Sequence, residues 1–267
     1  MKKQKNKATK KIRIIKIISI ILMILGVSII ISIQLSNIFC KGTVSSQINE
    51  FKQLRDSVLK DKNNNGNYNS DDKNDKGQRA ANNTVLYKAD LDKLYADSVN
   101  YNKKMIAHQR ELLKDTSYEI PALNLTDYGI PNNIYGYISA PSIGMELPIF
   151  LGANERNMSY GAAHLTYTSL PLGGAYSNCV LAGHTGYIGR IFFDNIVNLS
   201  VGDKVSVTNY WNTLTYEVKD SKILKDYQSG DCYIKSDKDM LTLITCVSDG
   251  KGGFNRYYVI CERKQGS

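Results

Sequence analysis

Hydrophobic and polar positions divide the chain into three stretches of different pattern. Residues 17–39 contain no charged side chain, and about 20 apolar residues are enough to cross a bilayer as a helix. Residues 85–114 carry apolar side chains at helical spacing, which predicts a second helix. After residue 134, short runs rich in Val, Ile, Thr and Tyr are separated by clusters of Gly, Asn, Asp and Ser, a pattern typical of strands.

The third stretch predicts a mainly β domain. Many short strands with few helices indicate a closed or nearly closed β-barrel of about 130 residues. A short helix is expected at 191–199. The strands are expected at Tyr135–Ser139, Glu146–Phe150, Cys179–Gly183, Lys204–Thr208, Asn212–Lys219, Leu241–Cys246 and Arg256–Cys261.

Polar composition sets the remaining boundaries. Residues 60–83 hold eight Asn, four Asp and four Lys, with almost nothing to bury, so a flexible spacer is expected there. The predicted organisation is a basic cytoplasmic tail at 1–16, a transmembrane anchor at 17–39, a polar linker at 40–83, a helical segment at 84–133 and the barrel at 134–267.

The net charge of +9 is concentrated at the N-terminus. Eight Lys and Arg residues precede residue 17 without any acid, and the rest of the chain is nearly neutral. A basic stripe for nucleic acid is therefore not expected. Basic residues beside a membrane helix stay in the cytoplasm, so residues 41–267 are expected outside the plasma membrane of a single-pass protein.

Two alternatives to an uncleaved anchor remain. A cleaved signal peptide has a shorter apolar core and a small-residue cleavage site, and no convincing site of that kind precedes Cys40. Lipidation of Cys40 is disfavoured by the bulky Phe39 before it.

Three side chains at predicted strand ends can support chemistry. His184 ends one strand, Cys246 ends another, and Arg256 begins the last. Three glycines between residues 250 and 253 allow the intervening loop to fold back and bring Arg256 beside the thiol. A thiolate with an imidazole suits nucleophilic catalysis, and a guanidinium can stabilise a developing oxyanion. On these residues alone, a structural role for Cys246 and His184 stays equally open.

Other polar residues near these positions are weaker candidates. Thr245, which precedes Cys246, and His164 are candidate substrate contacts. His164 could instead be structural, or form half of a metal pair with His184. The chain has no HExxH motif and no paired CxxC spacing, so no metal and no cofactor is expected.

The remaining thiols are expected to be bystanders. Cys179 and Cys261 fall within strands and are expected to be buried, and a disulfide between them requires their strands to meet. Cys232 falls in a loop and is expected to be exposed.

The motifs around these residues resemble the sortase family of membrane-anchored cysteine transpeptidases. Thr242-Leu-Ile-Thr-Cys246 matches the family's Thr-Leu-x-Thr-Cys pattern, and Leu181-Ala-Gly-His184 precedes its cysteine by 62 residues. The similarity runs from about Tyr135 to Arg263. It implies an eight-stranded β-barrel with Cys246 as nucleophile, His184 as general acid and base, and Arg256 as the oxyanion partner.

The subclass is less determined by the residues. The segment from Gly161 to Gly174, with a long helix before the barrel, is similar to class C, the pilin-polymerising branch. The Asp-Pro-aromatic lid of that branch is missing, and Asp127-Tyr128 is the only lid candidate. A second membrane helix after the barrel is also missing, and the 247–255 loop differs from that branch.

The resemblance implies partners and a reaction. Secreted proteins with a Leu-Pro-any-Thr-Gly-type C-terminal sorting signal would be cleaved between Thr and Gly and joined to a pilin lysine or a peptidoglycan precursor. Two rivals remain: another extracellular His-Cys peptidase, which releases acid, and a non-enzymatic membrane-tethered barrel for adhesion, whose Cys246 would be unreactive.

Overall fold

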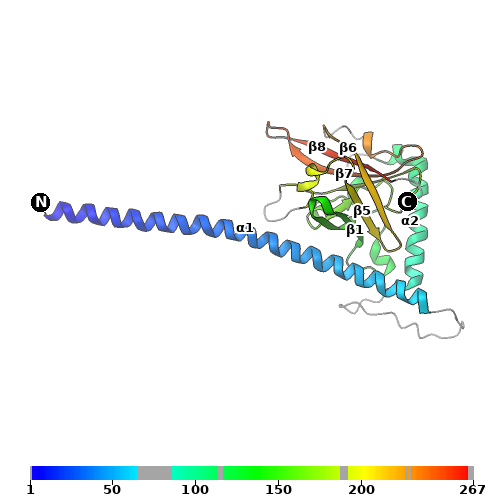
Figure 1. Ribbon diagram of the computed structural model, residues 1–267, viewed down its shortest axis with the longest axis horizontal. Helices are drawn as coiled ribbons and strands as arrows, with labels where there is room; N and C mark the ends of the chain where they lie inside the picture. Colours follow the sequence, from blue (N-terminus) through cyan, green and yellow to red (C-terminus); the bar gives the residue numbers. More distant parts are fainter. Residues whose placement is uncertain are drawn as a thin grey trace. The chain divides into compact units, whose positions relative to one another are not determined.

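The computed structural model describes residues 2–64, 86–113, 117–186, 192–225, 228 and 230–263 (Figure 1). Contacts divide the chain into two compact units. The first contains residues 1–43, and the second runs from Val44 and contains the barrel. Most of the spacer expected at 60–83 lies outside the described residues.

The first unit is the N-terminal part of helix α1 (Lys2–Asn64). Its large apolar side chains between Ile14 and Phe39 are exposed. By length and composition, α1 is the one described helix that could cross a membrane. An exposed apolar surface of this length fits a lipid environment.

In the second unit, α1 continues through the first half of the linker expected at 40–83. Ile48, Phe51, Leu54 and Val58 are buried there, at a spacing that places them on one helix face. Charged residues between them conceal this periodicity in the sequence. The expected polar linker is therefore wrong for residues 40–64, which are helical.

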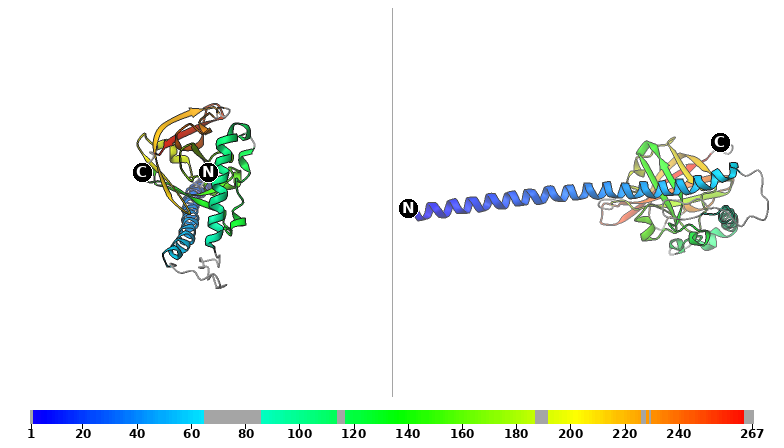
Figure 2. Two further views of the ribbon diagram at one scale, coloured as in Figure 1. Left: turned by 90° about the vertical axis from the view of Figure 1, so that its right-hand side faces the viewer. Right: turned by 90° about the horizontal axis from the view of Figure 1, so that it is seen from below.

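Helix α2 (Lys88–Leu112) runs along the outside of the barrel (Figure 2). Its Leu91 and Leu94 join Phe51 and Leu54 of α1 in one hydrophobic cluster with Tyr135 of the first strand. Two short 3-10 helices, η1 (Ser117–Glu119) and η2 (Leu125–Tyr128), lead from α2 to that strand. These helices cover one side of the barrel.

Eight strands close into a barrel in the order β1-β2-β3-β4-β7-β8-β6-β5, which confirms the predicted fold class. Every strand expected from the sequence is present, and β6 extends further than expected. The additional strand is β3, three residues long and too short for its alternation to stand out. The strands are β1 (Ile134–Ala140), β2 (Met145–Leu151), β3 (Ala162–His164), β4 (Ser177–Ala182), β5 (Lys204–Asn209), β6 (Thr213–Leu224), β7 (Asp239–Ser248) and β8 (Phe254–Glu262).

Short helices occupy four of the connections. They are η3 (Pro141–Ile143), α3 (Glu155–Met158), η4 (Asp194–Asn198) and η5 (Gly230–Cys232). The helix expected at 191–199 is thus the 3-10 helix η4, which follows β4 in the chain. Because β4 and β7 pair in parallel, their carboxyl ends meet at the same edge of the barrel.

Candidate active site

The parallel pairing of β4 and β7 aligns His184 with Cys246. The last registered pair is Ala182 with Ile244, and each candidate lies two residues beyond it. Two hydrogen bonds continue the alignment: Gly183 N donates to Ile244 O at 3.1 Å, and Thr245 Oγ1 donates to Gly183 O at 2.8 Å. Neighbouring strands lie about 4.8 Å apart, so the two residues occupy adjacent positions.

Arg256 lies on the other side of Cys246, on β8, so that His184, Cys246 and Arg256 form one row across the edge of the barrel. In the antiparallel pairing of β7 with β8, Arg256 is the direct partner of Cys246. Its guanidinium Nη1 donates to Cys246 Sγ at 2.5 Å. Both side chains are partly exposed. The pairing therefore places a cationic hydrogen-bond donor directly on the sulfur.

The β7–β8 hairpin folds back as its glycines predict. Gly250 and Gly252 adopt positive φ angles of 73° and 90°. The Asp249 carboxylate accepts from the backbone N of Lys251 and of Gly253, both at 2.8 Å. The turn therefore fixes the register that places Arg256 opposite Cys246.

Close packing explains the glycine before His184. A Cβ on Gly183 would lie 2.7 Å from Cγ of Phe193, which is fully buried. Phe193 N also donates to the His184 carbonyl at 3.1 Å. Any larger residue at 183 would displace the ring and, with it, the backbone that carries His184.

Burial lowers the pKa of His184 below its ordinary value, and the negative charge of Glu155 on α3 partly offsets this effect. The neutral imidazole, which accepts a proton, is therefore favoured near neutral pH. A lowered pKa also makes the protonated form a stronger acid toward a leaving amine.

The side chains of Thr245 and His164, the two weaker candidates, are buried. The hydroxyl of Thr245 donates to Gly183 O, so it links β7 to the residue that follows β4, next to His184 and Cys246. His164 is fully buried, with Nε2 3.1 Å from Ser169 O, and burial lowers its pKa to about 4. It pairs with Leu181 on β4, three residues before His184, and remains neutral inside the barrel.

The other barrel thiols are buried and unpaired. Cys179 and Cys261 both pair with Leu241 on β7, from opposite sides. Two strand spacings, about 10 Å, separate them, so the disulfide considered above is ruled out and both are free. The expected exposure of Cys232 is wrong, because it packs against Tyr258 at 2% exposure. Burial raises the pKa of Cys232 and of Cys261 to about 12, which leaves both unreactive.

The lid candidate Asp127-Tyr128 is attached to α2. Tyr128 is buried, and its hydroxyl donates to Asp97 Oδ2 at 2.8 Å. Lys93 Nζ lies 4.5 Å from the centre of its ring. These contacts make Tyr128 part of the helical cover.

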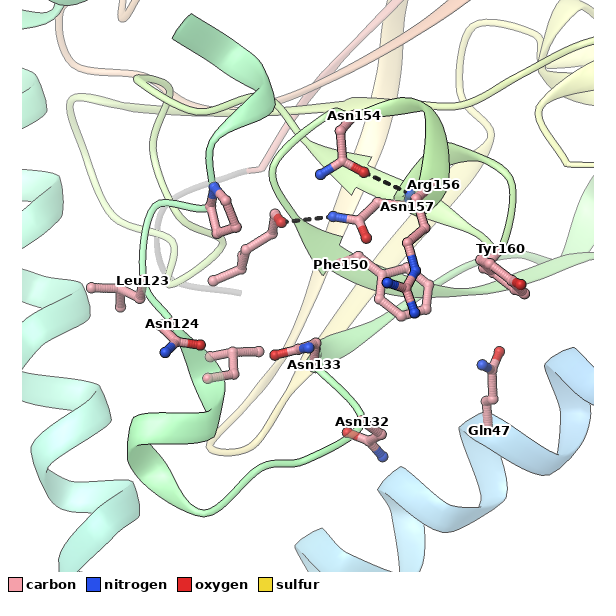
Figure 3. Close-up of a pocket in the computed structure, with 13 residues that line it drawn as sticks. Gln47, Leu123, Asn124, Asn132, Asn133, Phe150, Asn154, Arg156, Asn157 and Tyr160 are labelled. Atoms are coloured by element: carbon pink, nitrogen blue, oxygen red, sulfur yellow. Dashed lines mark hydrogen bonds between the residues drawn. The ribbon is translucent and has the colours of Figure 1, made fainter.

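A polar cavity of about 470 Å³ lies between α1, α3, the end of β2 and the segment before β1 (Figure 3). Its carboxamides are largely engaged by the protein, since Asn157 Nδ2 donates to Leu151 O at 2.9 Å and Asn154 Oδ1 accepts from Asn157 N. None of His184, Cys246 and Arg256 lines it. Within the described ranges, no three His, Cys, Asp or Glu side chains gather closely enough to hold a metal ion.

Comparison with known sequences finds similarity to sortases. The sortase domain model matches residues 138–264, which include the whole row. Sortase A of Bacillus anthracis is 34% identical over 127 residues, which is 47% of this chain and 58% of the relative. The matched region is thus less than two thirds of that relative's length.

Solved structures show the same barrel. Sortase C of Clostridium perfringens, determined with the C-terminal cell wall sorting motif, is 28% identical with a TM-score of 0.56, covering 67% of this chain and 92% of its own. A pilus-related sortase C of Group B Streptococcus is 28% identical with a TM-score of 0.57, covering 68% and 92%. The curated sequence relative is a sortase A, while both structures are sortases C, so the resemblance to class C rests on the fold.

Proposed function

We propose that this chain, whose residues 138–264 form a sortase domain, is a membrane-anchored cysteine transpeptidase. The observation that carries the proposal is the row formed by His184 just beyond β4, Cys246 on β7 and Arg256 on β8. A nucleophile, a proton carrier and a cationic hydrogen-bond donor in one row are the groups that acyl transfer requires.

The first half of the reaction uses all three residues. The Cys246 thiolate attacks the threonine carbonyl of a Leu-Pro-any-Thr-Gly-type signal, and Arg256 donates to the oxyanion of the tetrahedral intermediate. The carbon–nitrogen bond breaks as protonated His184 gives its proton to the departing glycine amine. The products are a thioester on Cys246 and the released C-terminal peptide.

The second half reverses the proton transfers. An incoming amine loses a proton to His184 and attacks the thioester, which forms a new amide and restores the thiolate. The acceptor amine is a pilin lysine or a cell-wall precursor peptide. The exposed apolar part of α1 supports a location in the plasma membrane with the barrel on the outer face, where both substrates arrive.

Product analysis tests this function. The full-length chain in detergent micelles is mixed with a Leu-Pro-any-Thr-Gly peptide and, in separate reactions, with a lysine side-chain amine or a stem-peptide amine. Mass spectrometry should find the peptide joined to one of these amines, and the better acceptor assigns the subclass. Release of free acid alone would indicate a peptidase, and no turnover with an unreactive Cys246 would indicate an adhesion module.

A matched control uses a second partly exposed thiol, Cys40 of α1. Cys40→Ala should retain transpeptidation, whereas Cys246→Ala should lose it. Loss in both variants would mean that the thiol chemistry does not belong to the barrel.

A further inference from the structure

The backbone that follows His184 is held by the carboxylate of Asp194 on η4. Asp194 Oδ1 accepts from Gly186 N at 2.7 Å and from Thr185 Oγ1 at 3.2 Å. Its other oxygen, Oδ2, accepts from Phe192 N at 3.0 Å. One side chain therefore joins the residues directly after His184 to the segment that leads into η4.

Phe193 holds the same backbone from its other side. Its ring packs on Gly183, and its N–H donates to the His184 carbonyl. The main chain at and after His184 is thus hydrogen-bonded to residues 192–194, and the Phe193 ring packs on Gly183 just before it. The registered pairing of β4 with β7 ends at Ala182, two residues before His184, so these contacts hold the backbone where strand pairing has stopped.

We propose that Asp194 is a positioning residue for His184. The Asp194 carboxylate holds the backbone that keeps the His184 imidazole beside Cys246 while the proton passes to the leaving amine. The inference rests on the proposed transpeptidase function. Asp194 touches no reacting atom in this arrangement and acts through the backbone of residues 184–186.

The arrangement requires a carboxylate. Three donors converge on two oxygens, and a carboxylate is acceptor-only, so all three are satisfied. In Asp194→Asn the side chain has the same size, but its NH₂ group must face Phe192 N or Gly186 N, where an acceptor is needed. The substitution therefore breaks part of the contact without leaving a cavity.

A second aspartate provides the matched control. Asp203 Oδ2 accepts from Ser200 N at 2.9 Å in the turn after η4, and within the described ranges no hydrogen bond joins Asp203 to residues 183–186. Asp203→Asn removes a comparable turn contact. The full-length chain carrying either substitution is compared with wild type on an amide sorting peptide and on its thioester analogue, whose thiolate leaves without a proton.

For Asp194→Asn, kcat on the amide should fall roughly 10- to 100-fold, because a positioned acid contributes about 10²–10⁴-fold and displacements near 1 Å are costly. KM should change little, and the rate on the thioester should fall much less than the rate on the amide. Asp203→Asn should behave as wild type on both substrates. An equal fall on both substrates, or no fall on the amide, would overturn the positioning role.

A second measurement separates this inference from the proposed function. Amide hydrogen exchange at Gly186 and Phe192, the two backbone donors to the Asp194 carboxylate, should accelerate in Asp194→Asn and not in Asp203→Asn, whether or not the protein turns over substrate. If the wild-type chain forms no acyl-enzyme, the proposed function fails and the exchange result still decides the contact. Unchanged exchange in Asp194→Asn would overturn the inference by itself.

Discussion

At each end of the paired strands β7 and β8, an arginine contacts a side chain of β7, but one contact is buried and the other is partly exposed. At one end, Arg263 just beyond β8 reaches Asp239 of β7, with Nη2 2.6 Å from Oδ2. At the other end, Arg256 of β8 reaches Cys246 of β7. Each arginine comes from the same strand and approaches the same neighbour, seven residues apart along both strands.

At the Asp239 end, hydrogen-bond donors occupy both carboxylate oxygens. The Asp239 carboxylate is 1% exposed and also accepts from Tyr216 Oη at 3.1 Å, from Ser177 Oγ at 3.2 Å and from Gly174 N at 2.8 Å. Every lone pair of the buried charge has a donor, so the pair is structural. A buried charge is tolerated only when it is compensated in this way.

The Cys246 end keeps its reactive groups accessible. Cys246, Arg256 and His184 are all partly exposed, and among the described residues the sulfur meets the guanidinium without the hydroxyl and backbone donors that surround Asp239. One strand pairing thus produces a structural ion pair at one end and the proposed catalytic row at the other. Burial and the number of donors around the acceptor decide between them.

Replacing the nucleophile should have the largest effect. Cys246→Ala removes the attacking sulfur, so formation of the joined product should fall below detection by mass spectrometry. The melting temperature should change little, because the side chain is partly exposed. Product formation at the wild-type rate would contradict the assignment of Cys246.

Removing the buried ion pair of Asp239 and Arg263 should reduce stability instead of activity. Asp239→Asn leaves Arg263 without its charge partner, and losing one member of a buried pair costs about 3 kcal/mol or more. Urea unfolding should show this loss, while kcat per folded molecule stays unchanged. The exposed Asp220→Asn, whose contact with Lys222 is 3.9 Å long, should cost little and serves as the control. A loss of kcat in Asp239→Asn would mean that the two ends are coupled.

Replacing the guanidinium of Arg256 by an ammonium should have an intermediate effect on the rate of acylation. Arg256→Lys keeps the charge but loses the planar fork, so the acylation rate should fall roughly 10- to 100-fold. Single-turnover measurements with the sorting peptide would detect this change. An enzyme as fast as wild type would show that charge alone suffices.

The helical cover should tolerate loss of its buried hydroxyl. Tyr128→Phe removes the hydrogen bond to Asp97, which should reduce the free energy of unfolding by about 1 kcal/mol. Because Tyr128 belongs to the helical cover, turnover should stay at the wild-type level. Faster turnover in this variant would reinstate residues 127–128 as a lid over the site.

The smallest effect should be electrostatic. Glu155 raises the pKa of His184, so Glu155→Gln should lower that pKa further. The imidazolium would then be lost at lower pH, and the acid-dependent limb of the rate profile should move to lower pH. An NMR titration of the His184 ring at low salt measures this shift, and an upward shift would contradict the sign.

The barrel and its row were largely predictable from the chain. Alternating runs located seven strands, and His184, Cys246 and Arg256 stood out because each falls where such a run begins or ends. The glycines at 250 and 252 indicated the tight hairpin that the structure contains.

What could not be predicted depends on long-range contacts. The sequence predicts a linker for the packed half of α1 because Phe51 and Leu54 stand among charged residues, and the apolar face of α2 that covers them is far away in the chain. β3 is three residues long and is defined by its neighbours on both sides. The burial of His164 and of Cys232 likewise follows from the closure of the barrel and its cover, which local pattern does not report.

Rapid-quench intact-mass measurement of the acyl adduct tests the shared centre most directly. Wild type, His184→Ala, Arg256→Ala and the double variant are mixed with a sorting peptide without acceptor amine. The account predicts a thioester on Cys246 in wild type, losses of about 100-fold or more in each single variant, and a double variant far less impaired than the product of the two losses. An adduct on another cysteine, or wild-type rates in either single variant, would contradict it.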